Sequence, residues 1–174
     1  MSTPSAIPVL TTEHLTLRGY RETDFYPFAA FAASERSRFV GGPQTRDEAW
    51  RSFMAAIGHW ALRGYGMWVV EHRESQKVVG RVGVILNDGW HEPELGWHIY
   101  DGFEGKGYAY EACVAARRYA AEHYDITPLM SYIDPANTRS IRLAERLGCH
   151  FERDVEVRGK PCQLWRHPGV EGMA

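Results

Sequence analysis

The spacing of hydrophobic residues near the start of the chain predicts a strand and then a short helix. Residues 13–20 set Leu15 and Leu17 against polar neighbours with a period of two, which is typical of a half-buried strand. Residues 23–34 then carry aromatic residues and alanines at helical spacing, with Thr23 in the position of an N-cap. The chain therefore opens with a strand followed by a helix.

The next segment, residues 45–64, has the clearest helix signals in the sequence. Thr45 and Glu48 have the spacing of a capping box, in which each side chain bonds the backbone N–H of the other residue. Gly64 is placed where a left-handed glycine commonly ends a helix. The predicted apolar stripe of this helix consists of Trp50, Phe53, Met54, Ile57 and Trp60.

Beyond Gly64, runs of β-branched residues alternate with helical patterns. The polar break at 73–76 between two such runs predicts a hairpin. The order of elements predicts an α+β domain with a mixed central β-sheet flanked by helices, and no repeat or linker divides residues 1–174, so we expect a single domain. Strands are expected at 66–72, 77–86, 92–100 and 129–133 and as a pair within 149–168, with helices from 108 onward and over 137–148.

Composition narrows the classes of partner. The chain has 174 residues, 44% hydrophobic and 24% charged, which is ordinary for a globular domain that folds without disulfides. The formal net charge is −2 and the isoelectric point is about 6.4, so no general basic field attracts nucleic acid or an anionic membrane. We therefore expect neither as a partner.

The cysteines and histidines do not have metal-binding spacing. The three cysteines are an odd number, and residues 91–95, HEPEL, lack the second histidine of a zinc-binding H-E-x-x-H motif. We therefore predict no metal. Unpaired cysteines, together with an N-terminus that lacks the charge and apolar core of a signal peptide, predict a soluble protein of the cytoplasm.

Residues 101–112, DGFEGKGYAYEA, join a predicted strand to a predicted helix through a glycine-rich turn. Gly105 and Gly107 let the backbone approach a ligand closely, and the free N–H groups at a helix N-terminus favour an anion such as phosphate. The same residues also suit a plain strand-to-helix turn, because two nearby glycines are a weak signal. Two known phosphate motifs do not fit, since Tyr110 replaces the third glycine of a dinucleotide fingerprint and Gly107, not serine or threonine, follows Lys106.

Three segments of the chain resemble one enzyme family. Residues 94–112, ELGWHIYDGFEGKGYAYEA, resemble motif A of the GNAT superfamily of acetyltransferases, where a strand enters an R/Q-x-x-G-x-G/A turn that holds the pyrophosphate of acetyl-coenzyme A. Residues 134–152 resemble the next family block, and residues 11–25 resemble the opening of the branch that contains ribosomal-protein N-terminal acetyltransferases. The resemblance implies the GNAT fold and acetyl-CoA as co-substrate, and it leaves the acceptor open.

The resemblance assigns the binding of acetyl-CoA to a strand, a turn and a helix start. The turn would line the pyrophosphate through backbone N–H groups, and the end of the preceding strand would pair with the pantetheine arm as if it were an added strand. Asn137 would bind that arm or serve as an ordinary N-cap, and the two roles are compatible. The implied residues are Trp97, His98 and Ile99 in the strand, Gly105, Lys106, Gly107, Tyr108 and Ala109 in the turn, and Asn137.

The reaction that the resemblance implies is direct attack of an amine on the acetyl thioester. An aliphatic amine has a pKa of about 8 to 10.4 and must lose a proton before it attacks. Strand alternation places Glu94 and His98 on one face of strand 92–100, so we expect Glu94 to be the base, with His98 as the second choice and Glu156 as the third. The competing interpretation is that Glu94 is a solvated strand carboxylate without a catalytic role.

Two departures from the family pattern bear on the mechanism. Many relatives place a tyrosine four residues after the Ser140 position to protonate the departing thiolate, but this sequence has Ala144. Ser140 or a water molecule would then take that role. Gly102 stands where the family often has its first Arg or Gln, which leaves more of the phosphate binding to backbone amides and Lys106.

The sequence therefore predicts an acetyl-CoA-dependent N-acetyltransferase that acts on a primary amine, either a protein N-terminus or a small molecule. We expect a monomer or a homodimer. Because Ala144 replaces the usual acid, the alternative is a non-catalytic acyl-CoA-binding sensor or regulatory domain on the same fold. Among the tryptophans, we expect Trp90 to face the acceptor.

Overall fold

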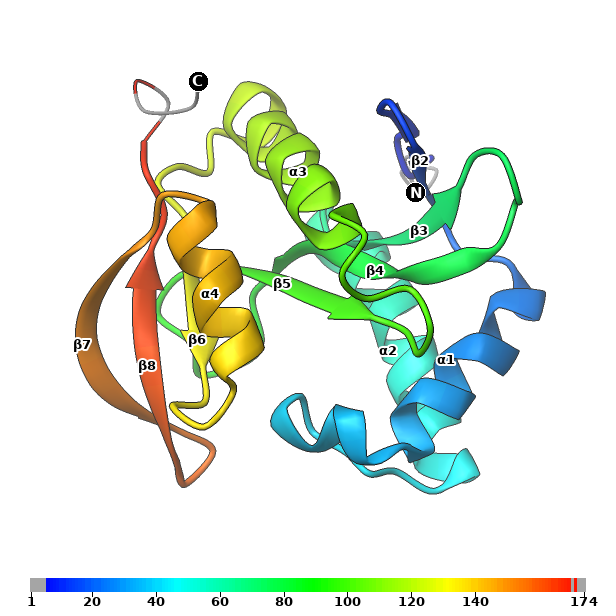
Figure 1. Cartoon of the computed structure of the whole chain (residues 1–174), viewed down its shortest axis with the longest axis horizontal. Coiled ribbons are helices and arrows are strands. Elements are labelled where there is room, and N and C mark those ends of the chain that lie inside the picture. The colour runs from blue at the N-terminus through cyan, green and yellow to red at the C-terminus, as the bar shows by residue number, and fades with distance from the viewer. Residues whose placement is uncertain (1–5, 170, 172–174) are drawn as a thin grey trace.

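The computed structural model describes residues 6–169 and 171, which are built around one mixed sheet of eight strands (Figure 1). The strands lie in the spatial order β1-β2-β3-β4-β5-β6-β8-β7, and only the pair β5 and β6 is parallel among the residues described. Residues 1–5, 170 and 172–174 lie outside the described residues, and so do the parts of two predictions that involve them, the one about a signal peptide and the one about a single domain over residues 1–174. The strands are β1 (Leu10–Thr11), β2 (Leu15–Arg18), β3 (Met67–His72), β4 (Val78–Ile85), β5 (Glu94–Ile99), β6 (Met130–Ile133), β7 (His150–Val157) and β8 (Lys160–Arg166).

Helices cover both faces of the sheet. On one face, α3 and α4 bury alanines and leucines against apolar strand residues such as Val82 and Leu95. On the other face, α1 and α2 form a second, aromatic core around Phe28 and Phe53. This arrangement confirms the predicted α+β fold with a mixed sheet between helices. The helices are η1 (Glu22–Asp24), α1 (Phe25–Ala33), η2 (Glu35–Phe39), α2 (Arg46–Arg63), α3 (Tyr108–Tyr124) and α4 (Thr138–Arg146), where η marks a 3₁₀ helix.

The prediction for the first helix start is wrong, because a buried ion pair of Asp24 fixes the chain one residue later. Thr23 lies inside η1, and Asp24 is the N-cap of α1. Both carboxylate oxygens of Asp24 accept hydrogen bonds from the buried Arg18 guanidinium, at 2.8 and 2.9 Å. Arg18 also bonds Glu71 of β3 at 2.9 Å, so this buried cluster holds the chain at the point where the helix begins.

The capping box of α2 is confirmed, but its predicted apolar stripe is partly wrong. Thr45 N–H donates to the Glu48 carboxylate at 2.8 Å, and Gly64 ends the helix with φ +77°. Phe53 is buried in the core with α1, whereas Trp50 is 40% exposed and Met54 is 47% exposed. The buried stripe is therefore narrower than the hydrophobic pattern indicates: Phe53 packs against α1 and Trp60 packs against Trp68 of β3.

The feature that matters for function is the separation of β5 from β6. The two strands are paired only at Glu94 and Met130, and β5 then runs on to Ile99 along a diverging path (Figure 1). The hydroxyl of Ser131 donates to the carbonyl of Leu95 at 2.6 Å, just beyond the last paired residues. The far part of β5 therefore has backbone groups on its β6 side that no strand of the described chain covers.

Candidate active site

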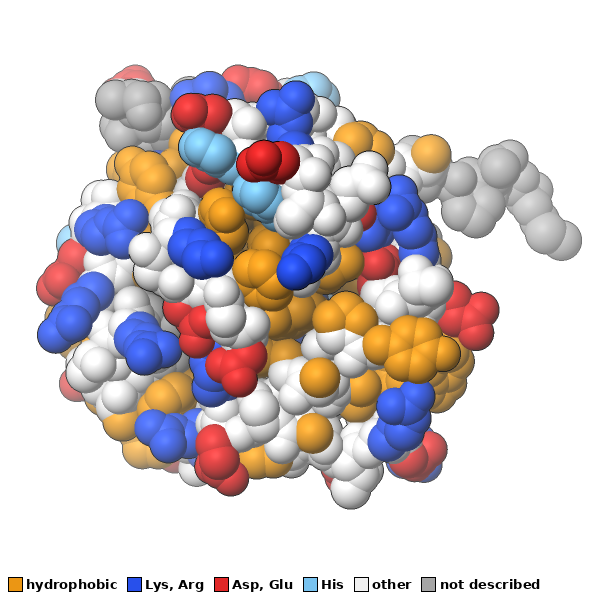
Figure 2. Space-filling view, turned by 45° about the vertical axis from the view of Figure 1, so that its right-hand side comes forward, with side chains coloured by type: hydrophobic (Ala, Val, Ile, Leu, Met, Phe, Trp, Pro, Cys, Tyr) orange, Lys and Arg blue, Asp and Glu red, His pale blue; other side chains and the backbone are white. Residues whose placement is uncertain are grey.

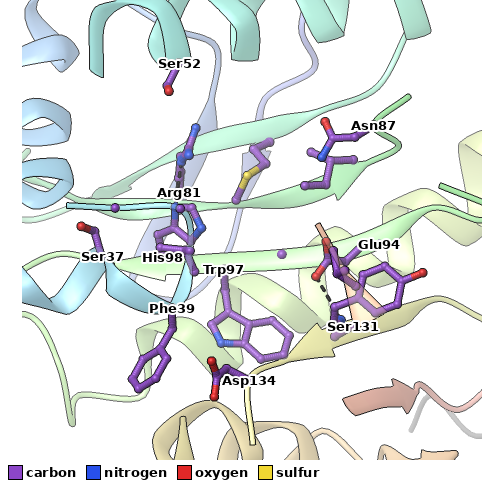
Figure 3. A pocket seen from close by; sticks show the side chains of 18 of the residues that line it. Ser37, Phe39, Ser52, Arg81, Asn87, Glu94, Trp97, His98, Ser131 and Asp134 are labelled. Atoms are coloured by element: carbon purple, nitrogen blue, oxygen red, sulfur yellow. Dashed lines mark hydrogen bonds between the residues drawn. The ribbon is translucent and has the colours of Figure 1, made fainter. Parts of the chain in front are cut away.

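A cavity of about 440 Å³ opens where β5 and β6 separate (Figure 3). One wall comes from β5, β6 and the start of α4, and the other comes from α1, η2 and α2. Trp90, predicted to face the acceptor, lines the cavity and packs edge-on against Tyr132 with a centroid distance of 5.3 Å. The lining residues important for the chemistry are Arg81 of β4, Glu94, Trp97 and His98 of β5, Ser131 of β6, and Asn137 and Ser140 at the start of α4.

Glu94 is the first residue of β5, and its side chain reaches across to β6. One carboxyl oxygen accepts a hydrogen bond from the backbone N–H of Tyr132 at 3.0 Å, and the residue is only 9% exposed. Burial raises the pKa of Glu94 from 4.5 to about 8, against smaller opposing effects of the Tyr132 N–H and of Arg158. The side chain is therefore not a solvated carboxylate, and its pKa suits proton transfer near neutral pH.

His98 lies on the same face of β5 as Glu94, next to Arg81 of β4. The Nε–H of Arg81 donates to Nδ1 of His98 at 3.0 Å, and the imidazole stacks on Phe31 of α1 with a centroid distance of 5.6 Å. Burial and the charge of Arg81 hold the pKa of His98 well below its ordinary value of 6.5. The ring is therefore neutral, with its hydrogen on Nε2, and is a weaker base than Glu94.

Trp97 points to the opposite face of β5, toward the start of α4 (Figure 3). Its indole N–H donates to the hydroxyl oxygen of Ser140 at 3.2 Å, which leaves the hydroxyl hydrogen of Ser140 free to donate elsewhere. The side chain of Asn137 accepts from the backbone N–H of Ser140 at 3.3 Å, so the predicted N-cap of α4 is confirmed. Ala144 is fully buried in the core one turn further along the helix.

The glycine turn follows β5 directly and leads into α3. Gly102, Gly105 and Gly107 all have φ between +72° and +86°, in the left-handed region that favours glycine. Gly107 is the N-cap of α3, and its carbonyl accepts the first helical hydrogen bond from Glu111 at 3.1 Å. The backbone N–H groups of the first helical turn therefore face away from the helix, where they suit an anion.

The predicted site residues form two groups along β5. The cavity brings together Glu94, Trp97, His98, Asn137 and Ser140. The second group does not line the cavity: Ile99 is the last residue of β5, and the turn residues Gly105, Lys106, Gly107, Tyr108 and Ala109 follow it.

One predicted candidate lies outside the cavity, and two cavity residues were missed. Glu156 is exposed on β7 and does not line the cavity, although its neighbours Val157 and Arg158 do. Arg81 and Ser131 were not predicted, because each is a single polar residue in an apolar strand pattern. The glycines around Arg81 in GRVG gave no signal for its role.

Two further features of residues 6–169 and 171 concern metal ions and membranes. No group of three or more His, Cys, Asp or Glu side chains there is arranged to hold a metal ion. None of the helices in this part of the chain is both long and apolar enough to cross a membrane.

Comparison with known proteins identifies the family. The family model described as acetyltransferase (GNAT) domain matches residues 14–150, which is most of the chain. The chain belongs to the GNAT acetyltransferase family. The resemblance of the glycine turn and of the α4 segment to GNAT motifs is thereby confirmed, together with the fold that it implied.

Relatives of this GNAT domain include proteins with and without a named acceptor. An acetyltransferase of Agrobacterium tumefaciens has a solved structure with a TM-score of 0.86 and 34% identity, over 97% of this chain and 98% of that one. The [ribosomal protein uS5]-alanine N-acetyltransferase of Escherichia coli is 28% identical over 83% of this chain and 78% of its own length. The uncharacterized protein YkkB of Bacillus subtilis is 28% identical over 59% of this chain, and the match spans 62% of that relative.

Proposed function

We propose that this GNAT domain transfers the acetyl group of acetyl-CoA to a primary amine by direct attack, with Glu94 as the general base. The observation that carries the proposal is the position of Glu94, a buried carboxyl with a raised pKa at the fork between β5 and β6. Near neutral pH the ionised fraction of a carboxyl with a pKa of about 8 can accept a proton from an ammonium group, and the group then returns that proton to solvent.

The residues beyond Glu94 suit acetyl-CoA in the order in which they follow along the chain. The diverging end of β5, residues 97–99, offers backbone groups that an extended pantetheine arm can pair with as an added strand. Gly105 and Gly107 have open space where a Cβ would lie, so the N–H groups around them can approach a pyrophosphate. Acetyl-CoA supplies the activated acetyl group as a thioester.

The protein groups that act on the developing charges come from both sides of the fork. Backbone N–H groups at the splayed end of β5, near Trp97, would stabilise the oxyanion. Ser140 accepts from Trp97 and has a hydroxyl hydrogen left to donate, so it would pass that proton to the departing thiolate while a water molecule returns a proton to the Ser140 oxygen. Ala144 takes no part, because it is buried in the core.

The proposal also includes two classes of amine as acceptors of the acetyl group. A relative named as a ribosomal-protein alanine N-acetyltransferase supports a protein N-terminus as one class, and a small-molecule amine is the other. We place the reaction in the cytoplasm, where acetyl-CoA and both acceptor classes are found. The sensor alternative gains no support from the comparisons, since the relatives whose names state an activity are acetyltransferases.

The test is release of free CoA from acetyl-CoA in the presence of amines. The panel contains amino acids, polyamines and short peptides with free N-termini, and acetyl-CoA without amine measures the background. Turnover with at least one amine, well above that background, supports the proposal. Tight binding of CoA without turnover on any amine would favour the sensor instead.

A further inference from the structure

Arg81 is a charged side chain in the wall of the cavity. It projects from β4 toward α1, and its guanidinium carbon lies 4.7 Å from the ring centroid of Phe28. Its Nε–H donates to His98, and the guanidinium also lies beside the buried hydroxyl of Tyr20. Because a guanidinium has five N–H donors, donors on the two terminal nitrogens remain without an acceptor among the described residues.

Arg18 and Arg166 are also largely removed from solvent, and both have carboxylate partners, whereas Arg81 has none. Arg18 contacts Asp24 and Glu71, and Arg166 contacts Glu92 and Glu152. No carboxylate among residues 6–169 and 171 lies within 4.0 Å of Arg81 in an ion pair. A guanidinium that is partly removed from water without a counter-charge favours an anion from outside the chain.

The other charged side chains that line the cavity also favour an anion, because basic residues outnumber acidic ones. Its basic side chains are Arg38, Arg81, Arg158 and Lys160, whereas its carboxyl groups are Glu94 and Asp134 only. Glu94 is largely neutral near pH 7, because its pKa is about 8. The chain as a whole has a net charge of −2, and the outer face in Figure 2 shows basic and acidic side chains interspersed. The basic excess is thus a property of the cavity.

His98 adds a second donor beside Arg81. Because Nδ1 of the imidazole accepts from Arg81, the ring hydrogen lies on Nε2, where it can donate to a ligand. Phe31 and Phe28 hold the imidazole and the guanidinium by stacking and by cation–π contact. The two donors are therefore fixed in orientation before a ligand binds.

The sheet register sets the spacing between this pair and the base. Arg81 lies opposite His98, and Ile85 lies opposite Glu94, so the anion-binding pair and Glu94 are on one face of the sheet. Four residues of strand separate them, which is about 13 Å of backbone. The residue between Glu94 and His98 on that face is Gly96, whose missing side chain leaves the floor of the cavity open up to the tip of Met67.

We propose that Arg81 and His98 form a carboxylate-binding subsite, and that the acceptor is a small molecule with an amine and a carboxylate several bonds apart. This inference rests on the proposed N-acetyltransferase function and specifies its acceptor class. The amine lies at Glu94 and the acetyl group, and the carboxylate lies against the guanidinium edge of Arg81 and the Nε2–H of His98.

The experiment compares acceptors that differ only in the carboxylate. CoA release is measured with a series of ω-amino acids, from glycine to 6-aminohexanoate, and with the matching carboxamides of equal length. The same measurement is made with Arg81→Gln, with Arg81→Lys, and with Arg63→Gln as a control at an exposed position in the last turn of α2. Thermal unfolding establishes that each variant is folded.

For the wild type we expect kcat/KM to favour the acid over its carboxamide by about tenfold or more, with a maximum above glycine in chain length. Arg81→Gln should bring this ratio close to one, Arg81→Lys should keep part of it, and Arg63→Gln should keep all of it. A ratio near one in the wild type, or an unchanged ratio in Arg81→Gln, would overturn the subsite.

A series of peptides shows whether the carboxylate-binding subsite alone is wrong or the N-acetyltransferase function is wrong as well. The peptides have free N-termini, amidated C-termini and no acidic side chains. Turnover with these peptides but with neither small-molecule series would overturn the subsite and retain the N-acetyltransferase function. The absence of turnover with every amine would overturn both.

Discussion

The carboxyl group of Glu94, on β5, accepts a hydrogen bond at 3.0 Å from the backbone N–H of Tyr132, on β6, two residues beyond the one pair that joins these strands. A side chain thus takes the place of a strand-to-strand backbone bond at the fork. Because the side chain is ionisable and buried, the same group contributes to the structure of the fork and to its chemistry. Replacing it with glutamine keeps an acceptor for Tyr132 and removes the acid–base function.

We expect Glu94→Gln to lower kcat/KM by about 10²- to 10⁴-fold, the range for loss of a general base. In the wild type, kcat/KM should rise with pH through about 8, as the Glu94 carboxyl loses its proton. The pH profile should be measured with an acceptor of low amine pKa, which is already neutral across this range. A midpoint near 8 that persists in Glu94→Gln would exclude Glu94 as its source.

Glu156→Gln is the matched control for this measurement. Glu156 was the third candidate from the sequence, but it is exposed on β7 and does not line the cavity. We expect less than about a twofold change in kcat/KM, because an exposed carboxylate away from the site stabilises no charge in the reaction. A large loss in Glu156→Gln would shift the base assignment away from Glu94.

Glu94 should also make the folded state less stable at alkaline pH. Its pKa is raised from 4.5 to about 8 in the folded protein, so the folded state holds a proton that the unfolded state releases. The stability that this proton contributes is fully present below about pH 4.5 and is lost as pH rises through 8. Thermal unfolding should therefore be measured for both proteins at pH 5 and pH 9. The stability of Glu94→Gln relative to the wild type should be higher at pH 9 than at pH 5. Equal pH dependence in the two proteins would contradict the raised pKa.

The parts of this site that follow local rules were predictable from the sequence, and the parts that depend on distant contacts were not. The strand period put Glu94 and His98 on one face, and the place of Asn137 at the start of a helical segment predicted the N-cap of α4. Arg81 looked like a chance charge in an apolar strand, because its partner His98 is 17 residues away. The register of two strands, which brings them together, is not encoded in either strand alone.

The glycine turn is predicted to bind the cofactor through backbone conformation, so its glycines should be sensitive to a single methyl group. Gly107→Ala forces an alanine to adopt φ +83°, which costs about 1 kcal/mol or more or reshapes the turn. Gly64→Ala is the control, since Gly64 also has a left-handed φ, +77°, and open space around its Cβ position. We expect both variants to lose similar stability, but only Gly107→Ala to raise the KM for acetyl-CoA.

A buried series of hydrogen bonds stabilises the point where β5 and β6 separate. Arg117 donates to Nδ1 of His167 at 3.3 Å, His167 then donates from Nε2 to the Ser131 hydroxyl at 2.9 Å, and Ser131 donates to the Leu95 carbonyl at 2.6 Å. Burial, with the nearby arginine charges, lowers the pKa of His167 from 6.5 to about 3. The ring is therefore neutral, and every hydrogen bond in the series donates in the direction from Arg117 to Leu95. These hydrogen bonds therefore fix the carbonyl of Leu95, the residue next to Glu94.

We expect Ser131→Ala to destabilise the protein by about 1 to 3 kcal/mol, because it leaves the Nε2–H of His167 buried without an acceptor. Urea unfolding at pH 7 measures this loss. Ser131→Thr keeps the hydroxyl and should restore much of the stability. Since Ser131 also ties β5 to β6 at the fork, Ser131→Ala should raise the KM for acetyl-CoA, and Ser131→Thr should reverse part of that rise. A loss of stability with an unchanged KM would mean that these hydrogen bonds support the core without positioning the cofactor strand.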